Sequence, residues 1–176
     1  MLRRGIMCTP EHITPSGYDM QFGTNVLGTF YFTQLLIPAL LRGAASSPDK
    51  HARIVTTASA YAYIGQIRFD TFKDGPARRR WNMEELYSQS KLGAILVAFE
   101  RARRYGDKGI ISVALHPGIL RTDMMMKAKG LRYRILVRRA SVSKCVHTES
   151  RLGAPGTYPK SNSYGGDYSP VRWHNA

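Results

Sequence analysis

Cysteine is nearly absent from this chain of 176 residues. The two that occur, Cys8 and Cys145, match no zinc-binding spacing and no disulfide framework, so we expect free thiols and no metal site. Long apolar runs are also missing, because the longest, residues 35–41 and 92–99, fall well short of the ~20 residues of a membrane-spanning helix. The first ten residues contain no apolar stretch typical of a secretory signal. Together these absences predict a cytoplasmic protein without a membrane span.

Acidic residues are few, with 12 against 26 lysines and arginines, and the formal net charge is +14 at pH 7. More than half of this excess lies in the last 50 residues. A strongly basic chain raises nucleic acid as a partner. The clusters Arg78–Arg80 and Arg101–Arg104, however, have no zinc-finger spacing and no aromatic RNA-binding pattern beside them. We interpret them as a loop and a solvated helix face, which makes nucleic-acid binding the least favoured function.

Two stretches have the apolar periodicity of helices. Residues 17–41 present a wide apolar face, and a polar loop rich in serine and proline is expected at residues 42–52. Residues 83–105 carry Glu84 and Glu85 in the first turn and arginines in the last, an order that suits the helix dipole. Both segments are therefore predicted to be helical.

Two short runs rich in β-branched residues predict strands at residues 53–57 and 110–115. Between these two strands, residues 61–82 contain Gly65 and Pro76, and we expect them to form an irregular surface loop before the second helix. Because a helix connects the two strands, they should lie parallel in one sheet. The pattern predicts a single α/β domain.

Tyr87 and Lys91 form a Tyr-x-x-x-Lys pattern inside the second predicted helix. A spacing of four residues places both side chains on one helix face. A lysine ammonium beside a phenol favours the phenolate, so we expect Lys91 to lower the pKa of Tyr87 towards a range useful for proton transfer. The same pair also occurs in many exposed helices without any function.

Three further polar features each have two interpretations. Ser59 directly follows a predicted strand, where it can donate to a substrate carbonyl oxygen or simply cap a turn. Asn25 lies within a predicted helix, either as a buried, satisfied polar group or as the holder of a water in a proton relay. Residues 117–122 follow the next strand, at the edge where a cofactor ring would lie, or form a plain turn.

Taken in chain order, Asn25, Ser59, Tyr87-x-x-x-Lys91 and Pro117-Gly118-x-x-x-Thr122 resemble the short-chain dehydrogenase/reductase family. The resemblance covers roughly residues 5–126. Residues 17–28, 87–92 and 115–118 are similar to the retinol-dehydrogenase-like branch, and the long loop before Tyr87 is similar to its fungal members. The resemblance implies a Rossmann-like, doubly wound parallel sheet.

The resemblance also implies a role for each matching residue. Ser59 would polarise the carbonyl or alcohol of the substrate, and Tyr87 would be the catalytic acid and base. Lys91 would lower the pKa of Tyr87, and Asn25 would hold the relay water. The implied reaction interconverts an alcohol and a carbonyl on a hydrophobic small molecule, of the kind found in secondary metabolism.

The implied cofactor is NADP, or NAD, which carries the hydride. Tyr87 and Lys91 would contact the nicotinamide ribose, and Ile119 and Thr122 would contact the nicotinamide carboxamide. No Gly-x-x-x-Gly-x-Gly segment, the family's pyrophosphate-binding turn, occurs in the chain. We therefore expect only part of the family sheet here, without its first strands and its Gly-rich loop.

This departure predicts two regions: a catalytic half of the family domain at residues 1–129, and a divergent, flexible basic tail at residues 130–176. A sheet with few strands should expose strand edges and apolar helix faces. The alternative hypothesis is an inactive, truncated remnant that pairs with another family member. Helices 17–41 and 83–105 would then carry homo- or hetero-oligomer contacts.

Overall fold

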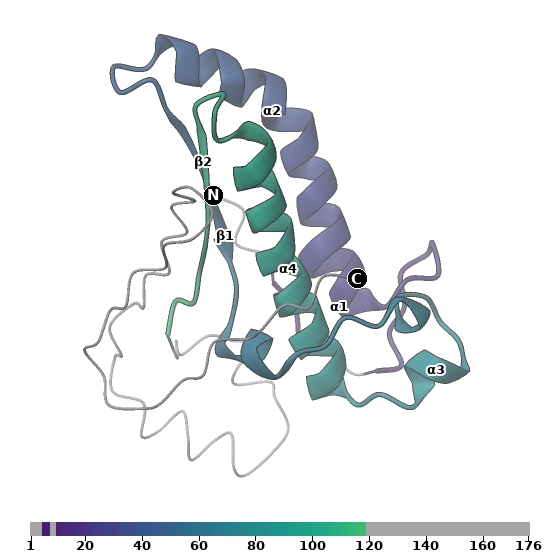
Figure 1. Cartoon of the computed structure of the whole chain (residues 1–176). Helices are drawn as coiled ribbons and strands as arrows, with labels where there is room; N and C mark the ends of the chain where they lie inside the picture. Colours follow the sequence, from purple (N-terminus) through teal and green to yellow (C-terminus); the bar gives the residue numbers. More distant parts are fainter. Residues whose placement is uncertain (1–4, 8–9, 119–176) are drawn as a thin grey trace, which may run out of the picture.

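The computed structural model describes residues 5–7 and 10–118. Within them, β1 (Ala52–Thr57) and β2 (Ile110–Leu115) form a parallel sheet whose register runs from Ala52 opposite Ile110 to Thr57 opposite Leu115. Helix α4 (Met83–Tyr105) connects the two strands, and α2 (Thr29–Ser46) lies beside α4 on the same side of the sheet (Figure 1). The predicted α/β class and the parallel pairing of the two strands are confirmed.

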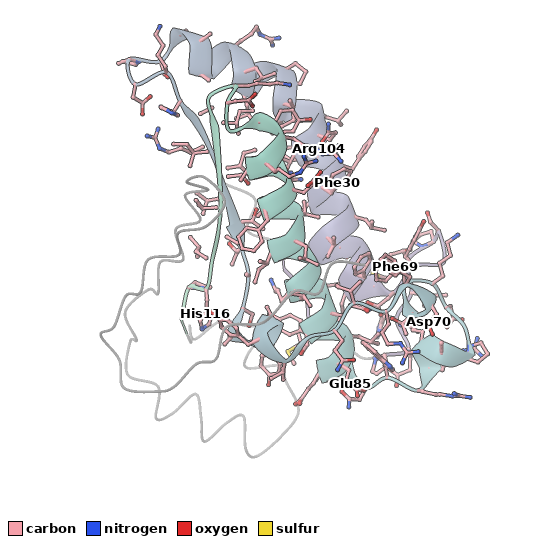
Figure 2. All side chains as sticks on the ribbon, in the orientation of Figure 1. Phe30, Phe69, Asp70, Glu85, Arg104 and His116 are labelled. Carbon is pink, nitrogen blue, oxygen red and sulfur yellow. The ribbon has the colours of Figure 1, made fainter. Side chains whose placement is uncertain are left out.

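Helix α4 begins and ends where its sequence predicts. The Asn82 side chain accepts hydrogen bonds from the backbone N–H groups of Glu84 and Glu85, at 2.9 and 3.0 Å. The Glu85 carboxylate in turn accepts from the Asn82 N–H at 2.8 Å, which completes a capping box. Glu85 and Arg104 lie at opposite ends of α4 in Figure 2, as the helix dipole favours. These local interactions fix the helix independently of distant segments.

The first helical segment differs from its predicted bounds of residues 17–41. It begins as α1 (Met20–Phe22), because Gly17 has a φ of 78° and Asp19 caps the helix by accepting from the Phe22 N–H at 2.8 Å. It continues through the π-helical segment η1 (Gly23–Gly28) into α2, which ends only at Ser46. The polar loop predicted at residues 42–52 is therefore wrong for residues 42–46. There Ala44 is buried, so tertiary packing extends the helix.

The segment predicted as an irregular surface loop is more ordered than its composition indicates. It contains the 3₁₀ helices η2 (Ala60–Ile64) and η3 (Phe69–Thr71) and the short helix α3 (Pro76–Arg79). Thr71 is fully buried, and Arg78 is only 2% exposed. The prediction of a solvated arginine cluster is thus wrong for Arg78, which pairs with the buried Asp19 at 3.0 Å. It is also wrong for Arg101, which is 3% exposed on α4.

The core between helix and sheet consists of small side chains. Ala58, Ala98 and Ala114 pack together with Ile95, which lets α4 lie close to both strands. The opposite face of the sheet exposes Val55 by 50%. Exposed apolar side chains also occur along α2, which agrees with the expected exposure of apolar faces; they are Phe30, Tyr31, Phe32, Leu35 and Leu36.

The helical stretch Met20–Ser46 is long and apolar enough to cross a membrane by length and composition alone. The sequence argument against a membrane span counted only uninterrupted apolar runs, and it overlooked this helix because Thr, Gln and Gly residues interrupt its apolar runs. The core helix of a globular domain passes the same test, and 22% of the most apolar window is buried against the rest of the protein.

Candidate active site

Three of the predicted site residues meet at the carboxyl end of β1. Ser59 follows that strand, while Tyr87 and Lys91 lie one turn apart on α4. The Lys91 ammonium is 5.5 Å from the centroid of the Tyr87 ring and donates to the carbonyl oxygen of Thr57, the last residue of β1, at 3.2 Å. The connection from β1 into α4 therefore brings the Ser59 hydroxyl, the Tyr87 phenol and the Lys91 amine close together.

Ser59 caps a turn, as one of its two interpretations predicts, whereas donation to a substrate oxygen stays a prediction. As the cap of η2, its hydroxyl accepts from the N–H of Tyr61 at 3.4 Å. It also forms a side-chain hydrogen bond with Tyr87 that lowers the pKa of the phenol. A turn serine is thus placed where its hydroxyl meets the phenol.

Tyr87 is only 5% exposed, and its burial raises the pKa of the phenol above 10.0. The hydrogen bond with Ser59 opposes this rise, whereas the nearby phenol of Tyr61 adds to it. The rings of Tyr61 and Tyr87 pack edge to face, with centroids 5.6 Å apart. The net pKa of Tyr87 is therefore raised where the sequence argument expected it to be lowered, because burial has the largest effect, and the contribution of Lys91 stays a prediction.

Burial moves the pKa of Lys91 in the opposite direction, from 10.5 to about 8. The side chain is 5% exposed and has no carboxylate beside it among the described residues, so desolvation of the charge is the cause. At neutral pH the amine still carries its proton. The backbone also comes close here, because a Cβ added to Gly5 would lie 3.2 Å from Lys91 Nζ.

Asn25 lies in η1 and is buried with every amide atom in a hydrogen bond. Its oxygen accepts from the Ile6 N–H at 2.8 Å, and its nitrogen donates to the Ile6 carbonyl at 2.9 Å and to the Ser90 hydroxyl at 2.9 Å. The interpretation as a satisfied, buried amide therefore holds. The relay water stays a prediction.

Ser90 was missed by sequence reasoning. Its side chain is fully buried, and its hydroxyl donates to the carbonyl oxygen of Tyr87 at 2.8 Å while it accepts from Asn25. It thus joins η1 to the turn of α4 that carries the phenol. The available signal was its place three residues after Tyr87, on the same helix face.

The second strand ends next to the site, with His116 at its end in Figure 2 and Gly118 at a φ of 80°. The predicted cofactor contacts Ile119 and Thr122 lie outside the described residues, as does the predicted tail at residues 130–176. Among residues 5–7 and 10–118, no three histidine, cysteine or acidic side chains are placed to hold a metal ion.

No family model matches the sequence. The chain is 51% identical over 121 residues to a short-chain dehydrogenase/reductase of Armillaria gallica, an alignment that covers 68% of this chain and 38% of that protein. This chain belongs to the short-chain dehydrogenase/reductase family. It is also 38% identical over 120 residues to human retinol dehydrogenase 13, covering 68% of this chain and 34% of that protein. The chain thus spans less than two fifths of the length of these relatives.

Solved structures support the same fold. An uncharacterized protein of Mycobacterium paratuberculosis matches with a TM-score of 0.56 and 34% identity, over 69% of this chain and 42% of that one. A 3-ketoacyl-(acyl-carrier-protein) reductase of Brucella melitensis, solved with NADH, matches with a TM-score of 0.53 and 24% identity, over 75% of this chain and 48% of that one. The expected Rossmann-like α/β class, present in part, is confirmed.

Proposed function

We propose that this member of the short-chain dehydrogenase/reductase family carries the proton-transfer site of an NAD(P)-dependent oxidoreductase. The enzyme would interconvert an alcohol and a carbonyl group on a hydrophobic small molecule. One observation carries the proposal: the Ser59 hydroxyl and the Lys91 ammonium both lie against the phenol of Tyr87 at the carboxyl end of β1. Ligands bind at this end of the strands in open α/β sheets.

The chemistry of carbonyl reduction follows from the state of these groups. Tyr87 is protonated at neutral pH because burial raises its pKa, so it can donate its proton to a carbonyl oxygen. Ser59 supplies a second donor for the negative charge that develops on that oxygen. Lys91, with a pKa of about 8, is charged at neutral pH and stabilises the phenolate that remains.

The donor set of Lys91 fits a nicotinamide cofactor, which supplies the hydride when bound. An ammonium has three donors, and within the described chain Lys91 Nζ directs one at the Thr57 carbonyl. The others match the hydroxyl groups of a ribose. Tyr87 would share that contact, and Ile119 and Thr122 would hold the carboxamide. NADP is the cofactor favoured by the resemblance to the retinol-dehydrogenase-like branch.

The relay role of Asn25 needs a free acceptor. Both amide hydrogens are donated, to Ile6 and to Ser90, so the Asn25 side chain can bind a water only at the second lone pair of its oxygen. That oxygen is 3.7 Å from the position of a Cβ built on Gly5, and Lys91 Nζ is 3.2 Å from the same point. A water between Asn25 and Lys91 would return a proton to the site after each turnover.

The test is the oxidation of NADPH in the presence of a series of hydrophobic aldehydes and ketones, followed by the absorbance of the reduced nicotinamide. Replacing Tyr87 by Phe should lower kcat by about 10²–10⁴-fold, the usual contribution of a general acid. Tyr63→Phe is the matched control, since Tyr63 is 71% exposed. Activity that survives Tyr87→Phe, or the absence of saturable NADPH binding to the wild-type chain, would contradict the proposal.

A cytoplasmic location and pairing with a second family subunit complete the proposal. Pairing through α2 and α4 is supported by the exposed apolar side chains of α2, among them Tyr31 at 66% and Leu35 at 63% exposure. Size-exclusion chromatography with light scattering measures it directly. A monodisperse monomer across micromolar concentrations would contradict the pairing and leave the proposed chemistry intact.

A further inference from the structure

One side chain of α4 forms hydrogen bonds with the segment between Ser59 and α3. Gln89 is fully buried on α4, two residues after Tyr87. Its carbonyl oxygen accepts from the backbone N–H of Arg68 at 2.8 Å, and its amide nitrogen donates to the Thr71 hydroxyl at 2.9 Å. The Thr71 hydroxyl then donates to the Arg68 carbonyl at 2.7 Å. The hydrogen bonds between the Gln89 and Thr71 side chains are buried, whereas those to the backbone of Arg68 are partly buried.

A second contact holds the same segment against α4. A Cβ added to Gly65 would lie 2.6 Å from the Ser88 carbonyl oxygen and 3.2 Å from Leu92 Cβ. Only a glycine allows the backbone to approach α4 so closely. Residues 60–71 are therefore held at two points on α4, against Ser88 and at Gln89, the two residues that directly follow Tyr87.

What these two contacts hold in place is one wall of the site. Residues 60–64 form η2, whose cap is Ser59 and whose Tyr61 packs edge to face on Tyr87. Both the donor hydroxyl and the ring that covers the phenol thus belong to the segment that Gln89 and Thr71 pin to α4. If this segment lifts, Ser59 and Tyr61 move away from Tyr87 together.

We propose that Gln89 and Thr71 are positioning residues, which hold residues 59–71 on α4 and thereby keep the Ser59 hydroxyl aligned with the Tyr87 phenol. The role in turnover rests on the proposed function, whereas the pinning of the segment does not. Neither residue touches the reacting atoms. Their effect on the reaction passes through the placement of Ser59 and Tyr61.

The first test needs no activity. Thr71→Val removes the hydroxyl without a change of shape and leaves Gln89 without its acceptor, whereas Thr71→Ser keeps the hydroxyl. In limited trypsin digestion read by mass spectrometry, Thr71→Val should be cut after Arg68 about tenfold faster than the wild type. The loss of one buried hydrogen bond raises the fraction of molecules in which this segment is detached from α4 by about that factor. Thr71→Ser should match the wild type. Cleavage after Lys50, in the turn beyond α2, is the internal control.

The second test separates positioning from a purely structural role. The groups around the phenol are Ser59, Tyr61 and Lys91, and burial is the largest cause of its raised pKa. If the segment lifts, water reaches the phenol, so the pKa of Tyr87 should fall towards 10.0 in Thr71→Val. The titration is followed by phenolate absorbance. The signal of the other tyrosines is removed by subtracting the curve of the double variant Thr71→Val with Tyr87→Phe. In turnover, kcat should fall about tenfold with KM changed less than about threefold, because the Ser59 donor acts mainly in the transition state.

The outcomes are distinguishable. Equal cleavage after Arg68 and an unchanged Tyr87 titration in Thr71→Val would overturn the positioning role, whether or not the chain turns over a substrate. Faster cleavage with a shifted titration would support it even if no carbonyl compound is reduced, and in that case only the proposed function fails. A loss of kcat that Thr71→Ser shares would also contradict the proposal.

Discussion

The buried ion pair of Arg78 gives the sharpest prediction for the stability of this fold. Arg78 lies on α3, 2% exposed, and donates to the Asp19 carboxylate through Nε and Nη2 at 3.1 and 3.0 Å. Nη2 also donates to the carbonyl oxygens of Pro10 and His12. One guanidinium thus joins residues 10–12, the cap of α1 and α3.

Replacing Arg78 by Met removes every one of these bonds and leaves the Asp19 carboxylate buried, at 1% exposure. The hydrogen bond from the Phe22 N–H to the Asp19 carboxylate is unaffected by this change. Removal of one partner of a buried ion pair costs about 3–5 kcal/mol, because the remaining charge stays desolvated. We therefore expect the free energy of unfolding to fall by about that amount. Neutralising the other partner as well, in Arg78→Met with Asp19→Asn, should recover about half of the loss.

Arg79→Met is the matched control. Arg79 is the next residue and also forms an ion pair, with Asp74 at 2.8 Å, but its side chain is 69% exposed. Exposed pairs contribute roughly 0–1 kcal/mol. Urea unfolding, followed by circular dichroism, gives the free energies of all variants on one scale. If Arg78→Met and Arg79→Met destabilise the protein equally, then the buried pair does not hold these segments together.

Three further predictions follow from burial and close packing. The pKa of Lys91 falls from 10.5 to about 8 on folding, so between these pH values the unfolded chain binds more protons than the folded one. The free energy of unfolding should therefore rise with pH over that window, by roughly 3 kcal/mol. Lys91→Met should abolish this rise in urea titrations. Gly65→Ala should destabilise the folded protein by roughly 1–3 kcal/mol, since the new Cβ would lie 2.6 Å from the Ser88 carbonyl oxygen. Gly43→Ala is the control: a Cβ at this position in α2 meets nothing within 4 Å, so thermal melts should show a stabilisation of about 0.5–1 kcal/mol. Carbonyl reduction should be level near neutral pH and decline above about pH 8 as Lys91 loses its charge, and a kcat/KM profile that stays level to about pH 10 would contradict the assigned role.

The parts of the fold that were predictable from sequence are those fixed by neighbouring residues. Helix α4 has its capping groups, Asn82 and Glu85, within one turn of its start, and the sequence placed it at the observed Met83–Tyr105. The strand at residues 110–115 was placed with equal accuracy, since its apolar run ends at Gly109 and Pro117. In both cases the deciding signal lies inside the segment itself.

The errors at Arg78 and Arg101 share one physical cause, which is contact with residues far along the chain. Arg78 is 59 residues from Asp19, so no local pattern shows that this arginine is buried while Arg79 is exposed. Arg101 donates to the Phe30 carbonyl at 3.3 Å across 71 residues. Its Nε and Nη1 have no partner in the described part of the protein, and the structure offers no counter-charge that explains its burial.

The candidate site divides in the same way. Ser59, Tyr87 and Lys91 could be singled out because their order and their elements form a recognisable set. Ser90 had only its helical spacing from Tyr87 as a signal and Gln89 had none, since their contacts are with Asn25 and Thr71, which reach α4 from other segments. The chemistry-bearing residues have a sequence signature, whereas the residues that align them acquire their role only after packing.

The corrected pKa of Tyr87 changes how the site must work. The sequence argument considered only the attraction between an ammonium and a phenolate, but the structure buries both side chains and desolvation then penalises each charged form. The phenol therefore holds its proton and the amine releases its own more easily. The Ser59 hydrogen bond and the Lys91 charge both favour ionisation of Tyr87, but only the first depends on the segment after β1, because Lys91 lies on α4 with Tyr87. In the proposed reaction Tyr87 would therefore act as an acid from its protonated state, and the placement of Ser59 would control how readily the proton leaves.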